Sequence, residues 1–292
     1  MLTIEYGDGV GVAVEHGTSV LEASQQAGIA HANACGGRGL CTTCRVQVQS
    51  GLQHCPEPED AERQALAIAG LPAGARLACQ LRPTGDIEVR VLIREHAAPS
   101  RAVPDATLEQ VAVLFIDIRG FTTFAEKQLP FDVSNVLNRY FDVMGIQVES
   151  HGGHILDYLG DGIMTLFRPG DELPERRALR CALDMCEASR SFCSWVQDHF
   201  NASLRTGIAV HAGRAVVGRL GYFRARHLGA VGDVLNLAAR LEDLNKDLQT
   251  DILVTEPVAE ATRDLAKLGR SFAMKVRGRS TPVTAYEVLG GR

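Results

Sequence analysis

The spacing of hydrophobic and polar residues divides the chain into two parts with different predicted elements. The first part holds four short segments in which the two kinds of residue alternate, and these predict β-strands at residues 2–6, 10–15, 45–49 and 87–93. A capping box from Ser19 to Glu22 predicts the start of a helix that Gly28 ends. The acidic residues between 57 and 62 predict the start of a second helix, where negative charge suits the helix dipole.

The second part has longer segments and more helix. An apolar run from Val111 to Ile116 predicts a buried strand that ends at Asp117. Helical periodicity predicts helices at residues 131–149, 174–200 and 234–247. Further strands are predicted at residues 154–158 and 163–167 as one hairpin, 205–211 and 215–217 as another, and within 272–288. Helices that alternate with hairpins favour an α+β sandwich.

Residues 95–107 separate the two parts. This stretch contains Pro99 and Pro104 and shows no periodicity, as expected of a linker. At 292 residues the chain is long enough for two domains with separate cores. We therefore predict one domain at residues 1–94 and another at residues 108–292.

Composition and charge exclude several classes of function. Apolar residues make up 46 % of the chain and charged residues 22 %, which is typical of a folded globular protein. The net charge of −5 argues against a nucleic-acid-binding or membrane-surface protein. No apolar run approaches the ~20 residues that a membrane helix needs, and the first residues lack a signal-peptide pattern. We therefore expect a soluble, cytoplasmic protein with neither nucleic acid nor membrane among its partners.

Four cysteines of the first part have a spacing that suits a metal cluster. Residues 35–44 read CGGRGLCTTC, and a fourth cysteine, Cys79, lies much further along. Four thiolates are what a [2Fe–2S] cluster requires, and glycines let a loop turn its N–H groups toward the sulfurs. A four-cysteine zinc site usually has two C-x2-C pairs, and this chain has one. A thioredoxin-like redox pair would leave two of the four cysteines without a role.

These residues resemble the ligand motif of [2Fe–2S] ferredoxins. The five-residue gap after the first cysteine is closer to adrenodoxin-like and bacterial ferredoxins than to plant-type ones. The resemblance implies a β-grasp fold over residues 1–94 and a bound [2Fe–2S] cluster. The ligands that it implies are Cys35, Cys41, Cys44 and Cys79. The acidic segment at residues 57–62 either docks a basic redox partner protein or only stabilises a helix end.

The other four cysteines are expected to be structural. Cys55 matches no ligand position of the ferredoxin motif. The remaining three, Cys181, Cys186 and Cys193, fit the apolar stripe of the helix predicted at residues 174–200. Free cysteine in such a stripe behaves as a small hydrophobic residue.

Two aspartates of the second part are placed to bind divalent cations. Asp117 ends a predicted strand, and Asp161 lies in a hairpin turn. Phosphoryl chemistry with two metals needs carboxylates that hold both ions ~3.5–4 Å apart. Their surroundings, FIDIRGFTTF at residues 115–124 and LGDG at residues 159–162, resemble the two metal motifs of class III adenylyl and guanylyl cyclases. The chain has no Gly-Lys dipeptide, which excludes a Walker A loop.

The resemblance to class III cyclases implies a fold and a set of ligands. The fold is an α/β sandwich with a ferredoxin-like βαβ core and an antiparallel sheet. Two Mg²⁺ (or Mn²⁺) ions are assigned to Asp117, Ile118 and Asp161. The triphosphate is assigned to the backbone turn at Gly120, Phe121 and Thr122 and to Arg277, which stands where the family has a lysine.

A third motif lies on the helix predicted at residues 234–247. Residues 231–240 read VGDVLNLAAR, and Asn236 and Arg240 share one helical face because they are four apart. By resemblance, Asn236 positions the ribose and Arg240 stabilises charge on the α-phosphate in the transition state. In this family each active site takes its aspartates from one chain and its Asn and Arg from another. A homodimer is therefore implied.

The base-recognition positions depart from the family pattern. Adenylyl cyclases usually have a lysine where this chain has Asp157, and an Asp or Thr where it has Gly229. Guanylyl cyclases carry Glu at the first position, and Asp157 is its closest chemical relative. A shorter carboxylate does not necessarily reach guanine, so the choice between ATP and GTP stays open, with ATP favoured.

The two resemblances together predict a nucleotidyl cyclase that converts ATP, or GTP, into the 3′,5′-cyclic nucleotide and pyrophosphate. The cluster is expected to regulate this activity through its redox state. Two alternatives are an electron-transfer ferredoxin that uses its cyclase domain only to dimerise, and a cyclase with a purely structural cluster. The intact metal and transition-state residues argue against the first. Equal activity of oxidised and reduced protein would favour the second.

Overall fold

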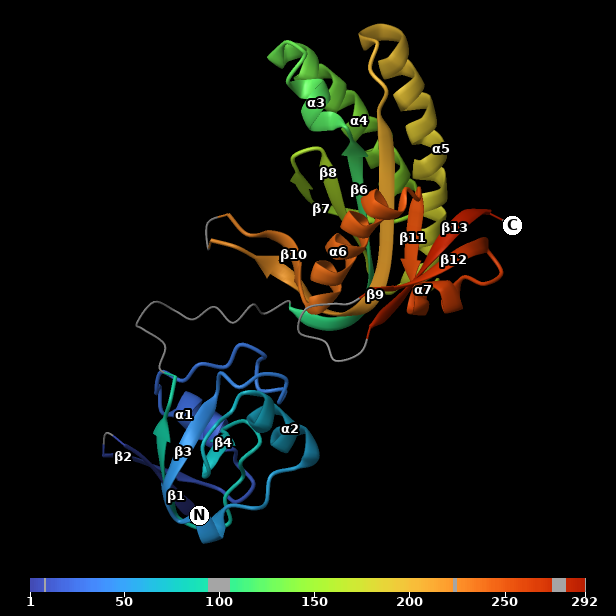
Figure 1. Cartoon of the computed structure of the whole chain (residues 1–292). Helices are drawn as coiled ribbons and strands as arrows, with labels where there is room; N and C mark the ends of the chain where they lie inside the picture. The colour runs from blue at the N-terminus through green and yellow to red at the C-terminus, as the bar shows by residue number, and fades with distance from the viewer. Residues whose placement is uncertain (8, 94–105, 223–224, 275–281, 292) are drawn as a thin grey trace. The chain divides into compact units, whose positions relative to one another are not determined.

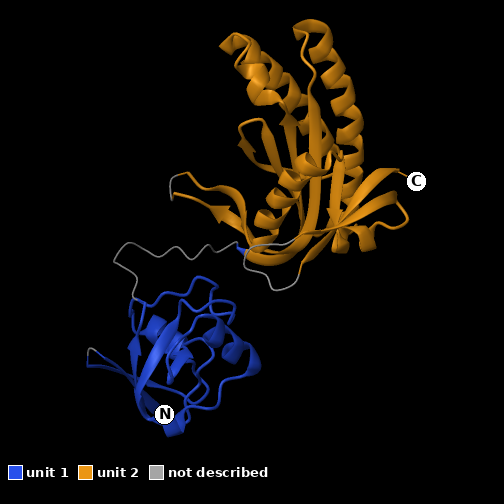
Figure 2. Ribbon diagram, in the orientation of Figure 1, with its two compact units in different colours: residues 1–106 blue, residues 107–292 orange. Residues whose placement is uncertain are grey.

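The computed structural model describes residues 1–7, 9–93, 106–222, 225–274 and 282–291. Two compact units make up the chain, Met1–Ala106 and Thr107–Arg292, and each is built on its own sheet (Figure 2). The predicted linker lies outside the described residues except for Ala106 and Thr107. Within the described ranges, no helix is both long and apolar enough to cross a membrane.

The first unit is a five-stranded mixed sheet with a helix packed against it. The strand order is β2-β1-β5-β3-β4, with β1 and β5 parallel and the other neighbours antiparallel. The strands are β1 (Leu2–Tyr6), β2 (Val10–Val14), β3 (Arg45–Ser50), β4 (Ala75–Leu77) and β5 (Ile87–Val91). The helices are α1 (Val20–Gln26), α2 (Asp60–Ile68) and a 3-10 turn at Leu52–His54. This arrangement fits the predicted β-grasp fold.

Helix α1 is fixed at its start by the predicted capping box. The Ser19 hydroxyl accepts a hydrogen bond from the Glu22 N–H at 3.2 Å, and the Ser19 N–H donates to the Glu22 carboxylate at 2.7 Å. The buried Tyr6 hydroxyl donates to the Val20 carbonyl at 2.7 Å. The two capping-box bonds satisfy N–H groups that a helix start otherwise leaves without partners. The Tyr6 bond ties the start of α1 to β1.

The second unit is an eight-stranded sheet with helices on both faces (Figure 1). Its main order is β12-β13-β11-β9-β6-β8-β7, and β10 pairs with β9. The strands are β6 (Thr107–Arg119), β7 (His154–Leu159), β8 (Gly162–Phe167), β9 (Arg205–Leu220), β10 (His227–Val231), β11 (Ile252–Thr255), β12 (Ala266–Met274) and β13 (Val283–Gly291). The helices are α3 (Phe121–Ala125), α4 (Pro130–Ser150), α5 (Pro174–Phe200), α6 (Asp233–Leu248) and α7 (Glu256–Ala261). The predicted α+β class is confirmed.

Strand β6 separates two cores because its side chains alternate between faces. Leu114 and Ile116 pack with α4 and α5. Val113 and Phe115 pack with Val234 of α6 on the other face. Since Asp117 follows Phe115 by two residues, it belongs to the α6 side of the sheet.

The predicted hairpin at residues 205–217 is wrong. Residues 205–220 form the single long strand β9, which pairs with β6 along thirteen positions from Arg205 to Val217. Gly213 falls in the gap between the two predicted strands, but it is part of β9 and lies under α6. A Cβ at Gly213 would be 3.4 Å from the Cβ of Val234, so glycine here permits close helix packing.

Candidate functional site

The four cysteines of the ferredoxin motif meet at one loop of the first unit. Three lie between α1 and β3, and Cys79 follows β4. The sulfurs of Cys44 and Cys79 are 3.5 Å apart, and the Cys41 side chain is hydrogen-bonded to Cys35. The four thiols thus form two adjacent pairs, and a [2Fe–2S] cluster needs two thiolates per iron. The donor set fits that cluster, which when bound would supply one-electron redox chemistry.

The loop backbone also suits the cluster. Gly36, Gly37 and Gly39 have φ values of 66°, 83° and 70°, in the region that favours glycine. The Gly39 N–H and the side-chain amide of Gln80 both donate to the Cys79 sulfur. The contact with Cys44 is the largest cause that lowers the pKa of Cys79, to about 6, and the same contact raises the pKa of Cys44. One thiol of this pair is therefore readily ionised, as cluster ligation requires.

One residue of the acidic segment at 57–62 is not on the surface. Glu62 is buried in a bidentate ion pair with Arg76, with N–O distances of 2.9 and 3.0 Å, and it accepts the Leu77 N–H at 2.7 Å. It therefore joins α2 to β4 and cannot contact a partner protein. Glu57 and Glu59 are exposed.

Asp117 and Asp161 lie side by side at the end of β6 and in the β7–β8 turn. The Ile118 N–H donates to Asp161 Oδ2 at 3.2 Å. Burial raises the pKa of Asp161 to about 6, with a further rise from its hydrogen bond to Asp117. Two carboxylates this close are stable together only with a proton or a cation between them. Their hard oxygen atoms suit Mg²⁺ or Mn²⁺, the ions assigned to them by the resemblance.

A lysine that the sequence motifs do not include faces the same carboxylate. Lys246 Nζ lies 2.9 Å from Asp117 Oδ2 and 3.4 Å from Glu242 Oε2. Contact with Asp117 raises the pKa of Lys246 to about 12. Burial, followed by the charge of Asp117, raises the pKa of Glu242 to about 7. The sequence shows the i,i+4 spacing of Glu242 and Lys246, but gives no sign that the end of α6 lies beside Asp117.

Asn236 and Arg240 precede Lys246 on α6 by ten and six residues, which puts them about 80° and about 120° around the helix from it. Both are exposed. Lys246 is six residues beyond Arg240, which places it about 9 Å further along the helix and about 120° around it. Asn236 lines an apolar cavity of about 400 Å³ together with Phe115 and Leu159. Asn236 near the start of α6 therefore faces this cavity, whereas Lys246 near its end faces Asp117.

The two base-recognition positions do not form an evident binding pair. Asp157 is exposed on β7 and accepts a hydrogen bond from the Tyr158 N–H at 2.9 Å. Gly229 lies on β10, where a Cβ would be 3.0 Å from the Leu220 side chain. Leu220 thus occupies the space that a base-reading side chain at this position would need.

Three of the four predicted phosphate-binding positions, Gly120, Phe121 and Thr122, lie within the described residues. Gly120 has a φ of 84° and precedes the short helix α3, which begins at Phe121. Thr122 is exposed. The turn is therefore open to a ligand at the same end of β6 as Asp117. Arg277 lies outside the described residues.

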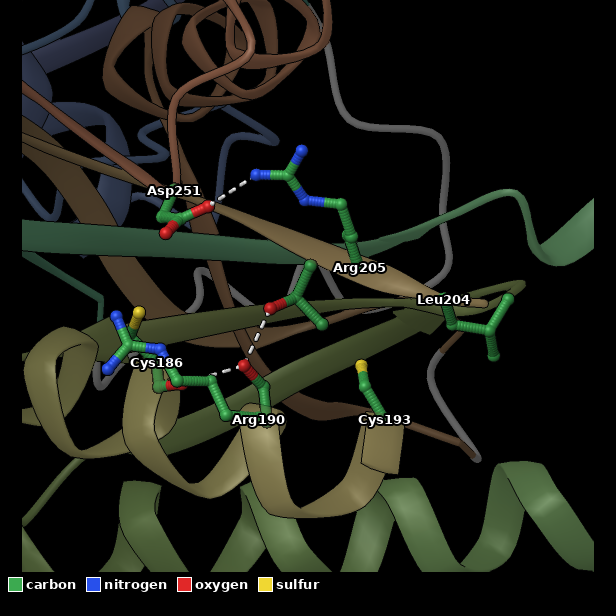
Figure 3. Close-up of a pocket in the computed structure, with 8 residues that line it drawn as sticks. Cys186, Arg190, Cys193, Leu204, Arg205 and Asp251 are labelled. Carbon is green, nitrogen blue, oxygen red and sulfur yellow. Dashed lines mark hydrogen bonds and ion pairs between the residues drawn. The ribbon is translucent and has the colours of Figure 1, made fainter. Parts of the chain in front are cut away.

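A separate cavity of about 220 Å³ lies on the α5 side of the sheet (Figure 3). Cys186 and Cys193 of α5 line it, as do Arg205 and Asp251, which form an ion pair at 3.4 Å. Burial raises the pKa of the Cys193 thiol to about 11 and also raises that of Cys186. These thiols are therefore protonated at neutral pH, in agreement with the structural role predicted for them.

Comparisons with known proteins agree with both resemblances. Residues 103–289 match the family model described as "Adenylate and Guanylate cyclase catalytic domain". Residues 4–84 match the model described as "2Fe-2S iron-sulfur cluster binding domain". The two models therefore cover the two compact units in chain order.

Individual relatives match the second unit. Adenylate cyclase 1 of Rhizobium meliloti is 34 % identical over 184 residues, covering 62 % of this chain and 28 % of the relative. Adenylate cyclase of Anabaena cylindrica is 33 % identical, covering 63 % of this chain and 37 % of the relative. The chain thus spans roughly a third of these relatives' length or less.

Solved structures match the same unit. The guanylyl cyclase Cya2 has a TM-score of 0.59 at 30 % identity, covering 64 % of this chain and 95 % of that one. The adenylyl cyclase CyaB of P. aeruginosa has a TM-score of 0.59 at 24 % identity, covering 64 % and 97 %. With a family model that covers more than half of its length, the chain belongs to the adenylate and guanylate cyclase catalytic domain family, and it carries a 2Fe–2S iron–sulfur cluster binding domain ahead of that catalytic domain.

Proposed function

We propose that the protein is a homodimeric nucleotidyl cyclase that converts ATP, or GTP as the alternative, into the 3′,5′-cyclic nucleotide and pyrophosphate. The observation that carries the proposal is the pairing of Asp117 with Asp161, with the Ile118 N–H on Asp161. Two-metal phosphoryl chemistry requires such a pair. The named adenylate cyclase relatives and the structural likeness to a guanylyl cyclase support the reaction class.

In the proposed reaction the ribose 3′-oxygen attacks the α-phosphorus. The 3′-hydroxyl loses its proton to solvent, a bond forms between its oxygen and the α-phosphorus, the bond from the α-phosphorus to the bridging oxygen breaks, and pyrophosphate carries away the electron pair. Divalent cations at Asp117 and Asp161 would lower the pKa of the 3′-hydroxyl and neutralise phosphate charge. Asn236 would orient the ribose, and the Arg240 guanidinium would stabilise the negative charge that develops on the α-phosphate.

The site is proposed to be completed by a second copy of the chain. Arg240 lies about 120° around α6 from Lys246, the residue that reaches Asp117, as the helical spacing requires. A nucleotide bound to the Asp117–Asp161 pair would then meet Arg240 of a partner subunit, and with it the Asn236 of the same motif, as the resemblance to class III cyclases implies. A symmetric dimer would contain two such sites.

Complementation tests this arrangement. Asp117→Asn and Arg240→Ala should each be nearly inactive as homodimers, because one loses metal binding and the other transition-state charge. Mixed after subunit exchange, the two should regain activity, since the heterodimer contains one site with both halves intact. Cyclic nucleotide formation would be measured with ATP and GTP in parallel. An absence of recovery, with heterodimers demonstrated by differently tagged subunits, would place the whole site within one chain.

We also propose that the redox state of a [2Fe–2S] cluster in the first unit controls the rate of the second. The paired cysteine thiols support cluster binding. The catalytic positions lie in a separate compact unit, so control would act on the geometry of the cyclase dimer rather than by direct chemistry.

A further inference from the structure

The side chain that faces the proposed metal ligands is an ammonium group. Lys246 Nζ is 2.9 Å from Asp117 Oδ2, the distance of a charge-assisted hydrogen bond. Asp117 has about a fifth of its side chain exposed, whereas Lys246 is nearly half exposed. The lysine thus reaches the partly buried carboxylate from the solvent side.

A second acceptor for this ammonium lies one helical turn back. Glu242 Oε2 is 3.4 Å from Lys246 Nζ, and the Glu242 side chain is 8 % exposed. Its other oxygen, Oε1, is buried without a hydrogen-bond partner among the described residues. An unpartnered buried carboxylate oxygen is costly. Glu242, whose Oε2 already faces Lys246, is therefore the buried acceptor that remains for this ammonium if Asp117 binds another cation.

The other charged groups nearby do not replace this lysine. Arg119 lies close enough for the charges of Glu242 and Asp117 to favour its charged form, but its Nη2 donates to the Thr250 carbonyl and its Nε and Nη1 are buried without a hydrogen-bond partner among the described residues. Asp243 is 3.9 Å from Lys246 but largely exposed. Asp161 adds a further negative group next to Asp117. Among the residues that the structure describes, Lys246 is the cation in hydrogen-bond contact with the carboxylate pair.

We infer that Lys246 is a built-in counter-cation that occupies Asp117 until a divalent cation binds and then moves onto Glu242. This positioning role rests on the proposed function, because it takes Asp117 as a metal ligand. While it holds Asp117, the ammonium stabilises the metal-free site and competes with the metal. Lys246 would thereby raise the metal concentration at which the site fills.

Mn²⁺ binding to the full-length protein tests this inference without measuring turnover. Free Mn²⁺ is quantified by its EPR signal, and the oxidised cluster does not interfere because it is diamagnetic. Lys246→Gln should bind Mn²⁺ roughly three- to tenfold more tightly than the wild type, which corresponds to a partly exposed ion pair. Without Mn²⁺, the same variant should unfold at a lower temperature, since the carboxylates lose their cation. Unfolding of this unit is followed by the fluorescence of Trp195, the single tryptophan.

Two further variants show whether Mn²⁺ affinity depends on Lys246 moving onto Glu242 or only on the total charge of the protein. Lys267→Gln removes an exposed lysine of β12 and should leave Mn²⁺ affinity unchanged. Glu242→Gln should weaken Mn²⁺ binding, and should do so more strongly with Lys246 present than in the Lys246→Gln background. Additive effects of the two substitutions would overturn the movement onto Glu242.

The outcomes also distinguish this inference from the proposed function. Wild-type protein that binds Mn²⁺, with the binding lost in Asp117→Asn but unchanged in Lys246→Gln, would refute the role of Lys246 and leave the metal site standing. Weaker binding in Lys246→Gln would also refute it, because the lysine would then organise the site instead of competing for it. Mn²⁺ binding that Asp117→Asn does not affect would count against the proposed metal site itself.

Discussion

A single buried ion pair ties two elements of the first unit together. Glu62 and Arg76 form the buried ion pair of the first unit, with side chains 2 % and 8 % exposed. Arg76 also donates to the Pro56 carbonyl at 2.6 Å. The acidic segment predicted either docking or helix-end electrostatics. Glu62 does lie in the first turn of α2, but its burial against Arg76 excludes docking. The sequence does not show this ion pair, because the arginine lies fourteen residues later and reaches Glu62 only in the folded chain.

Removing one member of this pair should destabilise the first unit strongly. In Glu62→Gln, Arg76 remains buried without its counter-ion, at a cost of about 3–5 kcal/mol. The joint change Glu62→Leu with Arg76→Met should cost less, because it leaves no buried charge. Cluster absorbance during denaturant unfolding reports this unit, and Trp195 fluorescence reports the other as an internal control. A double variant as unstable as the single one would show that lost packing, and not an unpaired buried charge, causes the destabilisation.

At the scale of elements, periodicity predicted the helices well and the pairing of strands less well. Helices α4, α5 and α6 begin and end within a few residues of their predicted limits. The prediction divided β9 at residues 212–214, whereas Gly213 lies within the strand because α6 approaches it closely. Spacing within α6 predicted the shared face of Asn236 and Arg240. The contact of Lys246 with Asp117 depends on how α6 lies on the sheet, which local periodicity does not encode.

The cysteine loop supports a prediction at this scale. Cys41→Ser or Cys79→Ser should lose the cluster, because each removes one of four thiolates. Cys55→Ser should keep it, since the Cys55 thiol donates to the Gly51 carbonyl at 3.8 Å and packs against the core. Iron and acid-labile sulfide are measured in anaerobically purified protein, with about two of each expected per chain. Stoichiometric zinc in place of iron would contradict the prediction.

For the whole molecule, the proposed redox control requires the two units to communicate. Each has its own core, and sequence motifs predicted what each binds. A coupling between them is a difference in free energy between two states of the dimer, and such differences do not follow from motifs. The covalent connection lies in residues 94–105, outside the described residues.

Redox control should appear as a rate difference. We expect oxidised and reduced protein to differ at least several-fold in cyclase rate, since allosteric couplings of ~1–3 kcal/mol correspond to roughly 5- to 150-fold. Rates would be measured anaerobically before and after reduction, with the cluster state followed by absorbance. The difference should vanish in full-length Cys41→Ser and in protein that lacks residues 1–94. Equal rates while the cluster demonstrably cycles would make the first unit a structural module.

The two sides of α6 have a consequence for inheritance. Asp117 of each chain would serve one site of the dimer and Arg240 of the same chain the other. A chain with a defect in only one of these residues therefore still leaves one working site when it pairs with a normal chain. A copy defective in both would silence both sites of every mixed dimer. Expressed in equal amounts with the normal protein, it would leave roughly a quarter of the dimers active. A single-residue defect would therefore act as recessive, and the combined one as dominant.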